Sequence, residues 1–171
     1  MEYSILISAE DLMANMTDPD WVIVDCRFSL SEPEKGRQMY LQGHIPGAVY
    51  ASINDDLSSP HIAGKTGRHP LPAIEKISRR LSEWGIDARV QVIAYDDWPV
   101  NLASAERLWW ILRWLGHKRV AILDGGWKQW VKKGFPQRCG VENKDQRIFE
   151  PNPNRDMYVE TADVEKIRLD P

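Results

Sequence analysis

The sequence predicts an α/β fold in which a central parallel sheet is covered by helices on both faces. Short apolar, β-prone runs such as Trp21–Val24 alternate along the chain with segments of helical periodicity. The order strand, helix, strand, helix implies right-handed crossovers and therefore parallel strands. The 171 residues, 43% of them apolar, suffice for one domain and a tail, but not for two full domains.

Charge and hydropathy exclude several classes of function. The net charge of -3 comes from 22 basic and 25 acidic residues without long blocks, which gives no footprint for nucleic acid or an anionic membrane. No run of about 18 apolar residues exists, and Met1–Ser4 lacks the basic start of a signal peptide. We expect a cytoplasmic protein.

The first elements are a capped helix and a buried strand. Ser8, followed three residues later by Asp11, predicts a helix that ends before Asp18. The next run, Trp21–Val24, is stopped by Asp25 and is typical of a buried parallel strand.

A polar segment, residues 34–42, leads to a turn and a second short strand. In the turn Gly43–Ala48, Pro46 fixes φ and Gly47 leaves it free. Residues 48–50 are the predicted strand.

A long loop and an amphipathic helix come next. Residues 55–72 contain many turn formers and little periodicity, which predicts a surface loop. From Ala73 to Trp84 the apolar residues recur at helical spacing, and Gly85 follows as a C-terminal cap.

The central strand is predicted at residues 90–95. A loop at 96–101 separates it from a long helix that runs through Leu115 and stops at Gly116. The last strand is expected at residues 120–123, and Gly125-Gly126 opens a helix to about Lys133.

The C-terminal segment predicts a linker and a repeat. Residues 137–157 are polar and contain Pro151 and Pro153. Residues 159–168 can be laid over residues 7–16, with Asp163 opposite Asp11 and Val164 opposite Leu12. We therefore expect a domain at 1–136, a linker at 137–158 and the truncated start of a second domain at 159–171. The alternative is a C-terminal helix that packs on this domain.

The loop after Tyr95 is the expected place for chemistry, because ligands of such folds bind at the carboxyl ends of strands. A sulfurtransferase or phosphatase would need Cys first in this loop, where backbone amides lower its pKa. Asp96 holds that position, and a carboxylate cannot carry a persulfide. Asp97 would repel anions, and Pro99 removes one amide from the loop.

Asp96 could instead be a nucleophile, as in haloacid-dehalogenase-type enzymes. The D-x-D spacing of those sites is absent, because the loop begins Asp96-Asp97. We favour the alternative that both aspartates cap the following helix and face solvent or a partner domain.

The two cysteines give no sign of reactivity. Cys26 follows the first predicted strand and is expected to be a buried, inert thiol, whereas Cys139 is expected to be exposed without a function. Neither forms a C-x-x-C pattern, so no zinc site, disulfide, metal or cofactor is predicted.

Other polar and aromatic candidates are assigned structural roles. Asp25 and Arg27 are expected to pair with each other or with backbone, and His44 to hold its turn by hydrogen bonds. Of the neighbours Trp109 and Trp110, we expect one to be buried and the other to lie near an interface.

Two stretches together resemble the rhodanese family. Val24–Arg27 with Tyr40–Ala48 is similar to its first signature, and Leu123–Trp130 is similar to its second. The chain departs from the family pattern at Leu123, Gln129 and Ala51, where an aromatic, an acidic and a larger residue are more usual. The resemblance spans about residues 7–136 and implies the rhodanese-like three-layer fold.

More narrowly, Tyr95-Asp96, residues 104–110 and residues 67–72 resemble the N-terminal half of thiosulfate and 3-mercaptopyruvate sulfurtransferases. This resemblance implies an inactive half whose partner is a C-terminal catalytic rhodanese domain of the same protein. That domain supplies the cysteine that moves sulfane sulfur from a small donor to a thiophilic acceptor such as cyanide.

The resemblance also assigns residues to two sets. The wall of the substrate site or interdomain face comprises Arg68, His69, Asp96 and Arg107. The structural motif comprises Asp25, Arg27, His44, Gly47, Asp124 and Gly125. A solvated basic loop is the alternative for Arg68 and His69.

Two other functions stay open at this point. One is a stand-alone inactive rhodanese module with a regulatory or protein-binding role. The other, a phosphatase of the same fold, would require a cysteine and an arginine in the loop after Tyr95, and neither is there.

Overall fold

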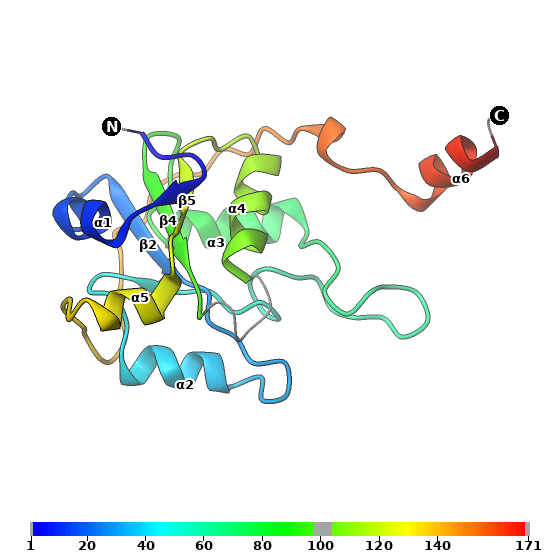
Figure 1. Ribbon diagram of the computed structural model, residues 1–171. Coiled ribbons are helices and arrows are strands. Elements are labelled where there is room, and N and C mark those ends of the chain that lie inside the picture. Colours follow the sequence, from blue (N-terminus) through cyan, green and yellow to red (C-terminus); the bar gives the residue numbers. More distant parts are fainter. Residues whose placement is uncertain (1, 98–103, 170–171) are drawn as a thin grey trace.

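The computed structural model describes residues 2–97 and 104–169 and contains a five-stranded parallel sheet (Figure 1). The strand order is β1-β5-β4-β2-β3, so β4 is central, as predicted. The strands are β1 Leu6–Ile7, β2 Trp21–Asp25, β3 Val49–Tyr50, β4 Gln91–Tyr95 and β5 Val120–Leu123. The helices are α1 Ala9–Asn15, α2 Lys35–Gln42, α3 Ile74–Glu83, α4 Ser104–Trp114, α5 Gly126–Lys132, the 3₁₀ helix Arg155–Met157 and α6 Thr161–Leu169.

The alternation of side chains along the strands creates two hydrophobic cores. Val92 and Ala94 of β4 pack in one core with residues of α3 and α4. Ile93 and Tyr95, which point to the other face, pack with residues of α1 and α5. The three-layer α/β class predicted from the sequence is therefore confirmed.

Most predicted elements are present. Ser8 caps α1, since its Oγ accepts a hydrogen bond from the Asp11 backbone N–H at 3.1 Å. Gly85 follows α3 with φ at +77°, as the predicted cap requires. The strand β2 extends one residue further than expected, because Asp25 pairs with Tyr95 of β4.

The sequence did not indicate β1 or α2. The strand β1 has only two residues, and Leu6 is exposed, so no pattern marked it. The helix α2 is mostly polar and buries only Gly36 and Tyr40. Gly36 is required there, because an added Cβ would lie 2.1 Å from the Arg27 carbonyl oxygen.

Residues 137–154 have the composition of a linker but pack along the domain. Phe149 is buried, and its backbone N–H donates to Ser82 of α3 at 3.0 Å. Further along, Asn152 and Asn154 donate backbone hydrogen bonds to the carbonyls of Leu115 and Trp114. The domain boundary at residue 136 stays a prediction.

The helix α6 lies apart from the sheet and its covering helices (Figure 1). Its apolar residues Val164 and Ile167 are 49% and 67% exposed. The described part of the chain contains no helix long and apolar enough to cross a membrane.

Candidate functional site

The carboxyl end of β4 is where the sequence placed the site, and Asp96 is buried there. Its Oδ2 accepts hydrogen bonds from the backbone N–H groups of Ser104 and Ala105, each at 3.1 Å. These donors lie at the start of α4, so Asp96 caps this helix, as predicted. The Asp96 side chain is buried, however, and does not face solvent as was also expected. The carboxylate of Asp96 is thus bound to backbone amides. In a sulfurtransferase or phosphatase of this kind, the sequence predicts a nucleophile at this position. Pro99 lies outside the described residues.

The backbone of Gly126 closely approaches the backbone of Asp96. Gly126, at the start of α5, has φ at +55°, and an added Cβ would lie 2.4 Å from the Asp96 carbonyl oxygen. The same carbonyl accepts a hydrogen bond from the Trp127 N–H at 2.9 Å. Gly126 therefore holds the loop after β4 against the turn after β5. The sequence pointed to Gly125 as part of the motif but did not indicate this contact of Gly126.

Asp25 and Arg27 form a buried ion pair, as the sequence analysis expected. Arg27 Nη2 lies 2.6 Å from Asp25 Oδ2 and 2.5 Å from the carbonyl oxygen of Gly43. Tyr95 donates its hydroxyl to the same Asp25 oxygen at 2.7 Å. Burial by itself would lower the pKa of Arg27, but Asp25, together with Tyr95 and Asp97, raises this pKa above its usual value. The pair is a structural link between β2, β4 and the turn at Gly43.

Neither cysteine is placed to act as a nucleophile in this loop. Cys26 is fully buried, and its pKa is raised well above the usual value by burial and by the nearby charges of Asp96 and Asp25. A thiol in such surroundings stays protonated, and the thiolate is the reactive form. Cys139 is exposed, and its Sγ lies 2.9 Å from the Gln42 carbonyl oxygen.

His44 holds its turn by hydrogen bonds. It is fully buried, its Nδ1 lies 2.7 Å from the Tyr40 carbonyl oxygen, and its ring stacks on that of Tyr40. Its backbone exchanges two hydrogen bonds with Arg138. Gly47 completes the turn with φ at +78°.

Asp124, the residue after β5, donates its backbone N–H to the carbonyl of Ile7 in β1.

Arg68, His69 and Arg107 lie close together around the loop of residues 57–70. Arg107 of α4 donates to the carbonyls of Leu57, His69 and Pro70, at 2.9, 3.0 and 3.1 Å. The pKa of His69 is lowered by burial and by the charges of Arg107 and Arg68. Arg107 thus fastens this loop to α4, a role that the sequence did not indicate.

The expectation that one of the neighbouring tryptophans of α4 is buried was wrong. Trp109 and Trp110 are both half-buried. Successive helical residues are separated by about 100° rather than 180°, so both can flank the buried stripe that Leu108 and Ile111 form. With Ile5 and Leu6, which are exposed, and the half-buried Ile122, they line an apolar groove of about 650 Å³.

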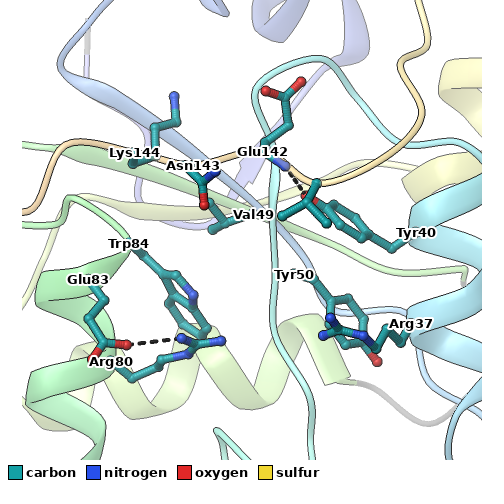
Figure 2. Close-up of a pocket in the computed structure, with 11 residues that line it drawn as sticks. Arg37, Tyr40, Val49, Tyr50, Arg80, Glu83, Trp84, Glu142, Asn143 and Lys144 are labelled. Carbon is teal, nitrogen blue, oxygen red and sulfur yellow. Dashed lines mark hydrogen bonds and ion pairs between the residues drawn. The ribbon is translucent and has the colours of Figure 1, made fainter.

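A second cleft, of about 280 Å³, lies beside the edge strand β3 (Figure 2). Arg80 lies across the ring of Trp84 and pairs with Glu83, while Arg37 and Tyr50 form the opposite wall. Its lining residues include neither cysteine nor histidine. Among the described residues no group of His, Cys, Asp and Glu could hold a metal ion. This cleft offers surfaces for binding and no thiol.

A family model described as a rhodanese-like domain matches residues 8–133. The chain is 37% identical over 166 residues to the "Probable 3-mercaptopyruvate sulfurtransferase" of Pseudomonas aeruginosa, a match that covers 96% of this chain and 58% of that protein. It is 28% identical to the thiosulfate sulfurtransferase of Bos taurus, over 91% of this chain and 52% of that protein. The chain therefore spans little more than half the length of these relatives.

Solved structures of such proteins share the fold. The crystal structure of SseA from Escherichia coli, described as a 3-mercaptopyruvate sulfotransferase with the rhodanese fold, superposes with a TM-score of 0.82 at 31% identity. The match covers 96% of this chain and 61% of that one. The 3-mercaptopyruvate sulfurtransferase from Leishmania major is similar in fold, with a TM-score of 0.77 at 23% identity. This match covers 88% of the present chain and 41% of the Leishmania major chain.

Proposed function

Since this chain belongs to the family of rhodanese-like domains, we propose that it is the N-terminal, non-catalytic unit of a tandem sulfurtransferase that uses thiosulfate or 3-mercaptopyruvate. The relatives are named as enzymes of these two kinds. The observation that carries the proposal is the buried, helix-capping Asp96 at the position where the chemistry requires a cysteine.

The reaction needs a thiolate that can accept a sulfur atom. A cysteine thiolate attacks the outer sulfur of thiosulfate, the S–S bond of the donor breaks, and sulfite leaves with the electron pair. The persulfide then passes its terminal sulfur to cyanide, which releases thiocyanate and regenerates the thiolate. The carboxylate of Asp96 cannot take this part, and the protonated, buried Cys26 cannot replace it. We assign the reactive cysteine to a second unit that follows this chain.

The C-terminal helix supports a second unit. In α1 the Leu12 N–H donates to the Ser8 carbonyl, and in α6 the Val164 N–H donates to the Glu160 carbonyl, so both helices begin at the positions that the repeat aligns. Leu12 is fully buried, whereas Val164 is 49% exposed. If α6 belonged to a second copy of the fold, Val164 would be buried there as Leu12 is buried in this domain. A stand-alone regulatory module would leave it without a partner.

We place Arg68, His69 and Arg107 on the face toward that second unit. Arg107 holds the loop of residues 57–70 by its carbonyls, and Arg68 is exposed on the same loop. The cationic character of this loop would favour an anionic donor such as thiosulfate in a site between the two units.

The test is cyanide-dependent thiocyanate production from thiosulfate and from 3-mercaptopyruvate. It compares residues 1–171 with the product of the complete reading frame. We expect turnover only by the complete product, with the better donor identifying the enzyme. Turnover by residues 1–171 alone that is lost in Cys26→Ser and retained in Cys139→Ser would contradict the proposal and make Cys26 the nucleophile.

A further inference from the structure

The cleft beside the edge strand β3 combines aromatic walls with positive charge. We call this hollow of about 280 Å³, shown in Figure 2, the β3 cleft. It lies at the edge of the sheet opposite β1 and shares no lining residue with the groove of Trp109 and Trp110. Proteins usually hold small ligands in concave sites that have apolar walls and a few convergent polar groups.

The positive charge in the β3 cleft exceeds what its acids neutralise. Three cationic side chains line it against two carboxylates. Glu83 is bonded to Arg80 at 2.9 Å, and Glu142 lies 3.2 Å from Arg138, which is outside the cleft. The side chain of Arg37 forms no hydrogen bond or ion pair with any described residue. An arginine in this state, on the wall of a concave cleft, attracts anions from solution.

Arg80 is held in place and still has free donors. Its Nε lies 2.9 Å from Asp56 Oδ1, and its Nη1 donates to Glu83 at 2.9 Å. Its guanidinium lies 5.3 Å from the centroid of the Trp84 ring. These contacts fix the plane of the guanidinium, whereas its Nη2 has no hydrogen-bond partner among the described residues. A fixed guanidinium of this kind is suited to the planar geometry of a carboxylate.

The aromatic and apolar walls favour a ligand that carries more than a charge. Tyr50 and Trp84 lie on opposite sides of the cleft, and Val49 and Val141 also line it (Figure 2). Val141 is 62% exposed. A planar apolar body in the cleft would remove this surface from water, which is favourable. An inorganic anion would gain only from the charge.

Lys144 adds to the positive potential of the cleft. It is half-buried, and burial lowers its pKa, while the charge of Glu142 acts in the opposite direction. Its amino group extends away from Arg80 and Trp84 (Figure 2). Lys144 therefore contributes charge at the rim, and a bound anion would favour its protonated form.

We propose that the β3 cleft binds a small carboxylate with a planar apolar body. The carboxylate pairs with Arg37 and Arg80, and the body packs between Tyr50 and Val141. This inference goes beyond the proposed function, because none of the residues assigned to that function lines the cleft.

Benzoate is the probe that tests the inference. It is titrated into ¹⁵N-labelled residues 1–171, and binding is followed by the chemical shifts of the backbone amides. We expect saturable shifts in the β3 cleft, above all at Tyr50, Asn143 and Lys144. Acetate carries the same charge without the ring and should bind about tenfold more weakly, because the ring adds apolar surface to the contact.

Two variants with the same loss of charge separate a direct contact from a general attraction. Arg37→Gln should weaken benzoate binding about tenfold, the usual effect of losing a hydrogen bond between charged groups. The stability of this variant should be unchanged, because the Arg37 side chain has no partner among the described residues. Arg79→Gln is the matched control. Arg79 is exposed on α3 and does not line the cleft, so this change should weaken binding by less than about twofold.

Four outcomes would overturn the inference. One is the absence of saturable shifts in the cleft, and another is their appearance at Trp109 and Trp110 instead. Equal losses in the two variants would show a response to net charge alone. Acetate that binds as tightly as benzoate would show that the aromatic walls take no part. None of these outcomes affects the thiocyanate assay, so the inference and the proposed function can fail separately.

Discussion

Asp96 shows how one residue at the carboxyl end of the central strand can stabilise the start of a helix. Its carboxylate caps α4 through two backbone amides and is almost fully buried. The cap satisfies N–H groups that the helix leaves without partners, and the negative charge suits the helix N-terminus. The adjacent Asp97 is partly exposed, and its Oδ1 has no hydrogen-bond partner among the described residues.

We therefore predict that Asp96→Ala lowers the free energy of unfolding by about 1–2 kcal/mol, the usual cost of losing such a cap. Asp96→Asn should retain most of this stability, because its side-chain oxygen still accepts the two hydrogen bonds. Denaturant unfolding followed by circular dichroism measures all three proteins. The control is Asp97→Ala, which should change stability by less than about 0.5 kcal/mol; equal losses for the two alanine variants would refute the capping role.

At the scale of elements, the turn between β5 and α5 positions the loop after β4. Gly126 approaches the Asp96 backbone so closely that no side chain fits, and its φ of +55° is one that other residues adopt only with strain. The two glycines of this turn thus join the ends of β4 and β5 at the carboxyl edge of the sheet. The absence of a Cβ at Gly126 thus allows the loop after β4 to contact the turn after β5.

The expected result for Gly126→Ala is a loss of stability larger than that of Gly134→Ala. Both glycines have positive φ, but an added Cβ meets nothing within 4 Å at Gly134 and would clash with the Asp96 carbonyl at Gly126. The strain of φ alone costs about 1 kcal/mol or more, so the difference between the variants isolates the contact. Thermal and denaturant unfolding of the pair give this difference, and similar losses would show that the close approach does not matter.

At the scale of the whole molecule, residues 137–154 pack along the domain. Arg147 pairs with Asp20 at 2.9 Å and with Asp87 at 3.3 Å, and Phe149 is buried in the core of α3 and α4. A segment with linker composition is thereby held at several points along the domain. These contacts fix where the chain leaves the domain and enters α6.

Phe149→Ala should lower the free energy of unfolding by about 3 kcal/mol or more, the typical cost of removing a buried phenyl ring. Ile148→Ala, at the exposed neighbouring position, should be nearly neutral. Both variants are compared in urea unfolding of residues 1–171. A loss at Phe149 no larger than that at Ile148 would mean that the segment is a free linker and that the domain ends near residue 136.

The sequence by itself determined the class of fold and the acidic character of the loop after β4, which begins Asp96-Asp97. Apolar runs of strand length alternating with helical periodicity are a local property, so the strands β2, β4 and β5 and the helices α1, α3, α4 and α5 could be predicted. That Asp96 follows the central strand, and that Asp25 pairs with Arg27, also follow from residue identity and position.

Only the tertiary structure decided which residues meet. The helix α2 forms because Gly36 fits against the Arg27 carbonyl, and the strand β1 exists because β5 offers its edge. The attachment of the 57–70 loop to α4 by Arg107 and the groove that Trp109 and Trp110 share with Leu6 depend on contacts between segments distant in sequence. Local patterns carry no information about such contacts, because their energy comes from the packing of surfaces that only the folded chain brings together.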